Sequence, residues 1–343
     1  MTRIQLHQIL FLLPCLLAFS LHAQQQQFAS LGDLKLTSGE TLHDTLIGYR
    51  TFGQLNEAKD NAILFPTWAS GTTEQLAGAI HPGSLADSSK YYVIAVDALA
   101  NGVSSSPSNS KVQPRMQFPK ITIRDMVNAE HELVVRTLGI HHLKAVMGVS
   151  MGGMQTFQWI AAYPDFMDYA IPIVGSPRLA PYDLLLWQLQ IDEITNDPAW
   201  NGGNYQGKPA QKDLEIISDL FVTTPWAFNS KNTREAVIPN LDEQVRKATF
   251  DANDHICQAQ AMMSLDISEN YDHSIEKTAA AIKAKVFVIV ARYDHVVTPQ
   301  PALDFAALLH APTVVLESEC GHTANGCEVD KITKAVSEFL SQK

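Results

Sequence analysis

One serine in the sequence has the neighbours of a catalytic nucleophile. It is the centre of a Gly-x-Ser-x-Gly motif, Gly148-Val149-Ser150-Met151-Gly152. The motif follows the apolar run 145–149 and opens a helical pattern that extends to residue 163. A sharp turn from strand to helix requires small neighbours, and it exposes the serine hydroxyl at the carboxyl end of a sheet, beside backbone N–H groups. The pattern therefore predicts that Ser150 acts as a nucleophile.

A serine hydroxyl needs a base that takes its proton and an acid that orients the base. Asp294 and His322 have the positions that these roles require. They lie a few residues after the β-like runs 286–290 and 313–316, where open α/β sheets place their functional groups. The chain order nucleophile, acid, histidine is also the one that accompanies this strand–turn–helix motif. We therefore predict a triad of Ser150, Asp294 and His322.

Other histidines and acids fit the pattern less well. His295 adjoins Asp294 on an extended segment and would point away from it. His255 and His273 lie in a stretch without strand patterns. Asp97 ends a β-like run but precedes the serine in the chain, so we expect it to be a turn residue.

Acyl transfer also needs N–H donors that bind the developing oxyanion. The first predicted donor is the backbone N–H of Met151, at the start of the helix that follows the serine. The second belongs to the loop 66–71, which follows an apolar run. We expect Ala69 to supply it, with Trp68 as the alternative. Gly71 would allow this loop to pack closely under the nucleophile.

Strand-like and helix-like segments alternate along most of the chain. Short apolar runs rich in β-branched residues are typical of strands buried in a parallel sheet, and they occupy 62–65, 91–97, 145–149, 169–174, 286–290 and 313–316. Helical periodicity marks 121–138 (with Thr122 as its predicted cap), 152–163, 301–309 and 329–340. The alternation predicts a doubly wound α/β sheet, with an antiparallel hairpin of 34–36 and 45–52 at its edge.

The stretch 177–281 interrupts this alternation, because it lacks a convincing buried strand. This stretch contains Trp187, Trp200 and Trp226 and the adjacent methionines Met262 and Met263. These residues favour a helical cap with a core of its own. We therefore predict four regions. They are a signal peptide (1–23), the first part of the core (24–176), the cap insertion (177–281) and the second part of the core (282–343).

The first 23 residues have the pattern of a secretory signal. Arg3 is their only charge, an apolar run covers 9–19, and Ala23 precedes four glutamines. The run contains Pro14 and is short for a membrane span. We therefore predict cleavage after Ala23 and an exported protein, periplasmic or secreted, without a membrane anchor.

Composition and charge narrow the classes of partner and cofactor. The 46% hydrophobic and 18% charged residues are typical of a globular protein. A net charge of −11 argues against nucleic acid and anionic membranes as partners. Neither a phosphate-binding glycine pattern nor a metal site is expected, since His322 has its role in the triad. In an exported protein Cys320 and Cys327 could form a disulfide and leave Cys257 free, or all three could be buried thiols.

Five segments of the chain match motifs of a known family. They are ITIRDMV (121–127), LGI (138–140), GVSMGGMQ (148–155), DPAWNGGNY (197–205) and FDAN (250–253). From about residue 34 to its end, the sequence resembles the homoserine O-acetyltransferase branch of the α/β-hydrolase superfamily. The resemblance implies an α/β-hydrolase fold with a helical cap, the same triad, a covalent acyl-enzyme and a homodimer.

Two departures from that branch bear on the activity. Its homoserine enzymes look to hold the substrate carboxylate with an arginine just before the Asp-Pro-x-Trp motif, and that place falls at or near Ile191. The branch's Gly-His-Asp reads Gly321-His322-Thr323. An exported protein would also lack the acyl-CoA donor. We therefore expect a serine hydrolase that cleaves a small-molecule carboxylic ester. The alternatives are an O-acyltransferase that uses an alcohol acceptor and a non-catalytic binding protein.

Overall fold

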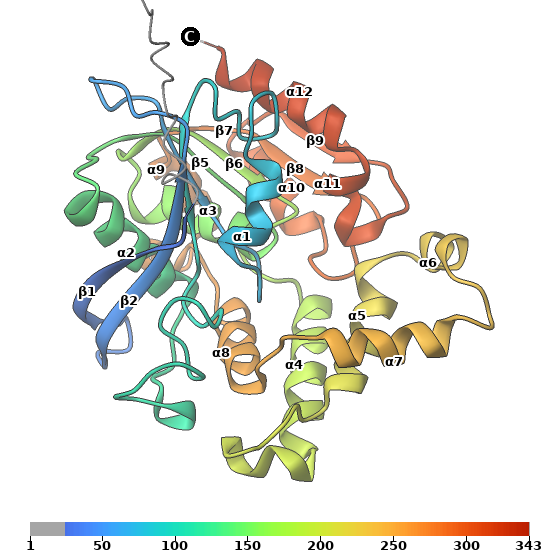
Figure 1. Cartoon of the computed structure of the whole chain (residues 1–343). Helices are drawn as coiled ribbons and strands as arrows, with labels where there is room; N and C mark the ends of the chain where they lie inside the picture. Colours follow the sequence, from blue (N-terminus) through green and yellow to red (C-terminus); the bar gives the residue numbers. More distant parts are fainter. Residues whose placement is uncertain (1–24, 343) are drawn as a thin grey trace, which may run out of the picture.

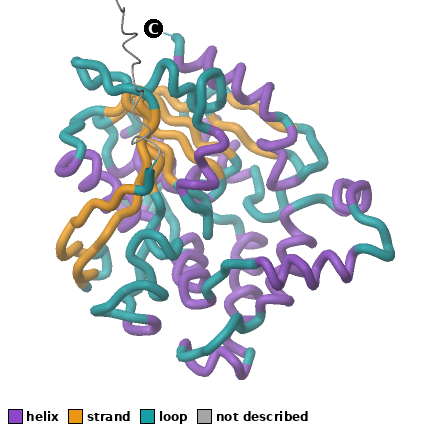
Figure 2. Tube along the Cα trace, viewed as in Figure 1, coloured by secondary structure: helices purple, strands orange, loops and turns teal. Residues whose placement is uncertain are grey.

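The structure is a computed structural model, and it describes residues 25–342 of the 343-residue chain (Figure 1). The predicted signal segment, residues 1–23, lies outside the described residues. A nine-stranded sheet runs through the molecule and is flanked by helices (Figure 2). Between residues 25 and 342 there is no helix of the length and apolar character that crossing a membrane would require.

The sheet is mostly parallel, with the strand order β1-β2-β4-β3-β5-β6-β8-β9 and with β7 beside β6. Its strands are β1 (Gln27–Lys35), β2 (Thr41–Phe52), β3 (Ala62–Pro66), β4 (Tyr92–Val96), β5 (Leu143–Val149), β6 (Met167–Ile173), β7 (Lys285–Val286), β8 (Val288–Ala291) and β9 (Thr313–Leu316). β2 pairs antiparallel with β1 and β4, and the other pairs are parallel. The predicted doubly wound α/β sheet is thus confirmed.

The edge hairpin is longer than the sequence pattern predicted. β1 begins at Gln27 rather than near residue 34, and its first residues pair with the middle of β2. Ala29 and Leu31 are buried on one face, but the register shifts on either side of Gly32 interrupt the alternation before Leu34, so hydrophobic periodicity does not mark this part as a strand. Its backbone hydrogen bonds to β2 are what make it a strand.

Apolar side chains fill both faces of the sheet. The helices that cover these faces and form the rest of the molecule are α1 (Thr73–Leu76), α2 (Ile123–Glu132), α3 (Met151–Ala162), α4 (Pro181–Asn196), α5 (Gln211–Val222), α6 (Pro225–Lys231), α7 (Val237–Lys247), α8 (Ala252–Met263), α9 (Ile275–Ala281), α10 (Gln300–Leu308), α11 (Ala324–Cys327) and α12 (Val329–Leu340). Leu64 and Val146 face a larger core formed with α2, α3 and α10, whereas Ile63 and Met147 face a second core formed with α1 and α12. Strands buried on both faces are expected in a parallel sheet.

Thr122 caps α2, as the sequence predicted. Its hydroxyl accepts the Asp125 N–H (3.2 Å), and the Asp125 carboxylate accepts the Thr122 N–H (2.9 Å), which is a reciprocal capping box. The regular helix ends at Glu132, earlier than the predicted residue 138. The remaining turns, Leu133–Thr137, are wound as a π-helix.

Helices α4–α9 lie between β6 and β7, and this stretch contains no strand of the sheet. Figure 1 shows α4, α5, α7 and α8 together on one side of the molecule, away from the sheet. Trp187 and Met262 are buried there, whereas Trp226 is 74% exposed and belongs to no core. We propose that this group is the cap, and its predicted limits at 177 and 281 stay a prediction.

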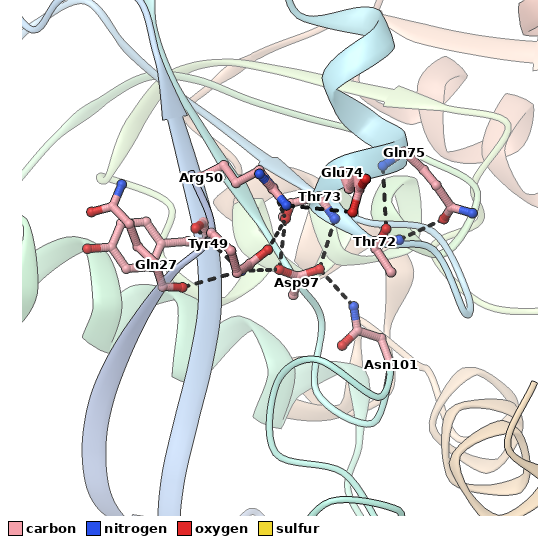
Figure 3. Close-up of polar contacts among 10 residues, drawn as sticks. Gln27, Tyr49, Arg50, Thr72, Thr73, Glu74, Gln75, Asp97 and Asn101 are labelled. Carbon is pink, nitrogen blue, oxygen red and sulfur yellow. Dashed lines mark hydrogen bonds and ion pairs between the residues drawn. The ribbon is translucent and has the colours of Figure 1, made fainter. Parts of the chain in front are cut away.

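A buried carboxylate at the end of β4 connects several parts of the core. One oxygen of Asp97 accepts the Thr73 N–H (2.8 Å) and the Asn101 amide (3.0 Å). The other accepts the Thr73 hydroxyl and the Gln26 amide, both at 2.9 Å. Figure 3 shows Thr73 and Asn101 directed at this carboxylate. Asp97, expected to be a turn residue, is therefore an anchor that fixes the start of α1 and the loop after β4.

Candidate active site

The structure brings the three residues of the predicted triad together. His322 Nδ1 lies 2.7 Å from Asp294 Oδ2, and His322 Nε2 lies 2.8 Å from Ser150 Oγ. A carboxylate can only accept, so Nδ1 carries the imidazole proton and Nε2 is left to accept the serine hydroxyl proton. The three residues come from the start of α3 and from the loops that follow β8 and β9. This is the geometry in which a serine becomes a nucleophile.

Ser150 sits on a strained turn between β5 and α3. Its φ of 57° and ψ of −120° are costly for a residue with a side chain. A Cβ added at Gly148 would lie 2.2 Å from the Gly152 carbonyl oxygen, and one added at Gly152 would lie 2.6 Å from that of Pro66. The motif therefore needs glycine at both positions, because no larger residue fits the turn.

Asp294 is fixed by the backbone of its own loop. Its Oδ1 accepts the N–H groups of Val296 (2.8 Å) and Val297 (2.9 Å), and its side chain is almost completely buried. These two bonds leave Oδ2 to face His322. Asp294 can therefore orient the imidazole and stabilise it when it is protonated.

A second buried acid ties the candidate cap to this loop. Asp183, in the first turn of α4, accepts the N–H and the hydroxyl of Thr298 and the N–H of Ala180. Burial raises the pKa of Asp183, and the nearby charge of Asp294 adds to this, whereas the hydrogen bonds oppose it. Asp183 thus fixes the segment just after Asp294 without touching His322.

The other histidines weighed from the sequence do not join the triad. His295 is exposed, as expected for a side chain that points away from Asp294. His255 Nε2 is bonded to Gln190 Oε1 at 2.9 Å, and His273 Nδ1 lies 3.5 Å from an oxygen of Asp266.

The predicted oxyanion donors have free backbone N–H groups. Within residues 25–342, the N–H groups of Met151, Ala69 and the alternative Trp68 donate to no protein acceptor. Ala69 lies in a turn that the Gly71 N–H closes by donating to the Trp68 carbonyl (3.0 Å). Gly71 packs against the Trp68 ring, since an added Cβ would lie 2.5 Å from the indole nitrogen. The oxyanion roles stay predictions.

The loop that carries His322 is closed by a disulfide between Cys320 and Cys327. The sequence had left this pairing open. The candidate cap contacts the same loop, because the Thr224 hydroxyl donates to the Glu319 carbonyl at 2.6 Å. The remaining cysteine of the described residues, Cys257, is free and buried, and burial raises the pKa of its thiol to about 12.

Opening this disulfide is expected to destabilise the protein and to slow turnover. Closing a loop of this length contributes about 2–3 kcal/mol to the free energy of unfolding in the chain-entropy account. Cys327→Ser should therefore unfold at a lower temperature than the wild type and have a lower kcat, since His322 would be less firmly held. Both are measured with and without dithiothreitol. Cys257→Ser is the matched control and should keep the wild-type response to reductant. Equal melting temperatures for Cys327→Ser and the wild type would contradict this prediction.

The place where the resembling enzymes look to have an arginine is apolar here. Ile191 lies in α4 and is buried in the larger apolar core. Thr323, which replaces the aspartate after the histidine, donates its hydroxyl to the Cys320 carbonyl (2.9 Å). Neither position offers a cation to a substrate carboxylate.

The cap segments that carried the family resemblance hold one another together. Trp200 Nε1 donates to Asn253 Oδ1 (2.9 Å), the Asn253 amide donates to the Gly203 carbonyl (3.0 Å), and the Asn253 N–H donates to the Tyr205 hydroxyl (3.1 Å). These segments therefore support the structure of the candidate cap rather than its chemistry.

Comparisons with known proteins agree with this architecture. A family model described as alpha/beta hydrolase fold matches residues 80–326. The chain is 33% identical to an ethyl acetate hydrolase of Pseudomonas veronii (81% of this chain, 83% of the relative) and 32% identical to a homoserine O-acetyltransferase of Symbiobacterium thermophilum (87% and 85%). The structure of an acetylester hydrolase from Corynebacterium glutamicum is similar, with a TM-score of 0.87 at 28% identity (93% of this chain, 96% of that chain). The chain therefore belongs to the alpha/beta hydrolase family, and its relatives include both esterases and homoserine O-acetyltransferases.

Proposed function

We propose that the protein hydrolyses carboxylic esters through an acyl-enzyme formed on Ser150. The observation that carries the proposal is the hydrogen-bonded series Ser150–His322–Asp294, with distances of 2.8 and 2.7 Å. The esterases among the relatives support the same reaction class. The names of two of them point to acetate esters as the first substrates to test.

In the acylation step, Ser150 Oγ attacks the ester carbonyl carbon while its proton passes to His322 Nε2. Asp294 stabilises the imidazolium, and the N–H groups of Met151 and Ala69 bind the oxyanion of the tetrahedral intermediate. When the intermediate collapses, the bond to the alcohol oxygen breaks and His322 gives its proton to that oxygen. The products are a free alcohol and an acylated Ser150.

In the deacylation step, water replaces the departed alcohol. His322 Nε2 takes a proton from this water, which attacks the acyl carbon. A second tetrahedral intermediate forms, and its collapse returns the proton from His322 to Ser150 Oγ. The carboxylic acid leaves and the resting triad is restored.

Water is favoured over an amino-acid alcohol as the acceptor because Ile191 stands where the resembling homoserine enzymes look to have an arginine. No arginine occurs in the sequence between Arg178 and Arg234, and Ile191 is buried among apolar side chains. A guanidinium holds a carboxylate in two parallel hydrogen bonds, and without it homoserine would bind poorly. The proposed export of the protein would also separate it from acyl-CoA. Transfer of an acyl group to an alcohol is the second candidate, supported by the homoserine O-acetyltransferases among the relatives.

One assay separates these two functions. The protein that begins at Gln24 is given short- and medium-chain acyl esters in water alone, and then homoserine together with acetyl-CoA. We expect ester hydrolysis that the second pair does not increase, and a preference for short acyl chains. Acetylation of homoserine at a rate above that of hydrolysis would instead favour the acyltransferase, and would require another group to hold the carboxylate.

The homodimer implied by the family resemblance also stays a proposal. The side chains that support it are exposed apolar residues of α4 and α5. Tyr182, Leu185 and Leu189 are spaced to share one face of α4, and Leu220 lies on α5, against which α4 packs. Exposed apolar faces of this kind favour contact with another protein surface.

A further inference from the structure

The loop between β3 and α1, which carries the proposed oxyanion donor Ala69, is fixed at both ends by residues of the core. At its start, Gln155 of α3 donates to the Thr67 carbonyl at 3.1 Å. At its end, the Asn101 amide donates to the Gly71 carbonyl at 2.9 Å. These contacts leave the middle of the loop, residues 69–70, to be held by another element.

Gln258 of α8 holds the middle of the loop. The Ser70 N–H donates to Gln258 Oε1 at 2.7 Å, and Gln258 Nε2 donates to the Leu99 carbonyl at 3.0 Å. Gln258 is 1% exposed. Since its amide donates and accepts at the same time, this one side chain connects the candidate cap to the loops that follow β3 and β4.

The backbone of Ser70 needs such a partner. Its φ is 57°, a left-handed conformation that costs a residue with a Cβ about 1–2 kcal/mol. Ala69 and Ser70 are the central residues of the turn closed by Gly71 and Trp68. Without an acceptor for the Ser70 N–H, the peptide between Ala69 and Ser70 would be free to rotate toward negative φ at Ser70, and the adjoining backbone that carries the Ala69 N–H would lose its fixed position.

We propose that Gln258 is a positioning residue, which holds the turn 68–71 so that the Ala69 N–H stays directed at the carbonyl attacked by Ser150. This inference rests on the proposed function, because the position of the turn matters to turnover only if Ala69 binds the oxyanion. Loss of an oxyanion donor lowers kcat by about 10²–10³. Gln258 acts through the loop, so its loss is expected to lower kcat by about 10- to 100-fold and to change KM by less than about threefold.

The test compares Gln258→Met with Gln260→Met. Methionine has nearly the length of glutamine but forms neither hydrogen bond, and Gln260 is half-buried on the same helix with no side-chain bond to either loop. Besides kcat and KM for an acetate ester, the inhibition constant of a trifluoromethyl ketone is measured. Ser150 Oγ adds to this ketone, its proton passes to His322, and the ketone oxygen becomes the oxyanion. Inhibition by the corresponding methyl ketone, which stays unreacted, serves as the ground-state reference.

Gln258→Met is expected to raise the inhibition constant of the trifluoromethyl ketone by the same factor by which it lowers kcat. The inhibition constant of the methyl ketone should stay unchanged. The isosteric Gln258→Glu keeps an acceptor for Ser70, so its kcat should lie between those of Gln258→Met and the wild type. If Gln258→Met does not fold, the smaller Gln258→Leu carries the test, because it also forms neither hydrogen bond and should lower kcat at unchanged KM.

Wild-type kcat in the folded Gln258→Met or Gln258→Leu variant, or an equal loss in Gln260→Met, would overturn the inference. A loss that appears in KM alone would overturn it too, because it would mark Gln258 as a ground-state contact. Ser150→Ala, run in parallel, reports on the proposed function itself. If Ser150→Ala keeps its turnover, the proposed function is wrong. If Ser150→Ala is inactive while Gln258→Met matches the wild type, only the positioning role fails.

Discussion

Ser150→Ala is expected to lower ester turnover by at least a thousandfold while the protein stays folded. The substitution removes the oxygen that would form the acyl-enzyme, so the remaining rate enhancement could come only from the oxyanion donors and from substrate binding. The methyl group of alanine fits where the serine Cβ already lies, and no buried polar atom loses its only partner except His322 Nε2. The melting temperature should therefore stay close to that of the wild type.

The measurement is kcat on an acetate ester, together with labelling by a serine-directed phosphonate. Ser264→Ala is a suitable control, since Ser264 is exposed at the end of α8 and its hydroxyl donates to a helix carbonyl. The wild type and Ser264→Ala should both be labelled and active, whereas Ser150→Ala should be neither. Turnover above about a thousandth of the wild-type value in Ser150→Ala would count against the acyl-enzyme mechanism.

Asp294→Asn is expected to lower kcat by about 10⁴ through the tautomer of His322. The Val296 and Val297 N–H groups need an acceptor at the Oδ1 position, so the carbonyl oxygen of the new amide would turn toward them. The amide NH₂ would then face His322 Nδ1 and donate to it. The imidazole proton would move to Nε2, which could no longer accept the proton of Ser150.

Asp183→Asn is the matched control for this prediction. Asp183 is also completely buried and accepts backbone N–H groups near the same loop, but it does not touch His322. Its variant should lose stability and keep kcat within about tenfold of the wild type, as expected for a residue outside the reacting groups. Similar losses of kcat in the two variants would show that the effect comes from a disturbed loop rather than from the tautomer.

The spacing of short motifs was enough to predict the sheet and to choose the three residues that the structure brings together. Gly148 and Gly152 mark the turn at Ser150 because no larger residue fits there, so this local constraint is visible in the sequence. Asp294 and His322 follow β8 and β9, and parallel strands bring such positions to one edge of the sheet. The glycines around Ser150 and the apolar runs before Asp294 and His322 are local patterns. The rule that parallel strands end at the same edge of the sheet is what brings these three residues together.

The contacts that the sequence did not reveal depend on pairing between distant segments. Gln258 reaches a residue 188 positions away, and the spacing of α8 gives no sign of it. Gln155 and Gln258 lie on helices that carry other polar residues as well, so nothing in the sequence distinguishes them. The pairing of Cys320 with Cys327 was left open, because sequence does not decide between a disulfide and two buried thiols.

The hydrogen bond between Gln26 and the buried Asp97 limits where the chain can be shortened or joined to a tag. Gln26 gives the carboxylate one of its donors, so the segment just before β1 belongs to the network that fixes the start of α1. A shortened version that begins after Gln26 would remove the side-chain amide that donates to Asp97 Oδ2. An affinity tag is therefore better attached after Lys343, or before Gln24 with a flexible spacer, than fused directly to Gln26.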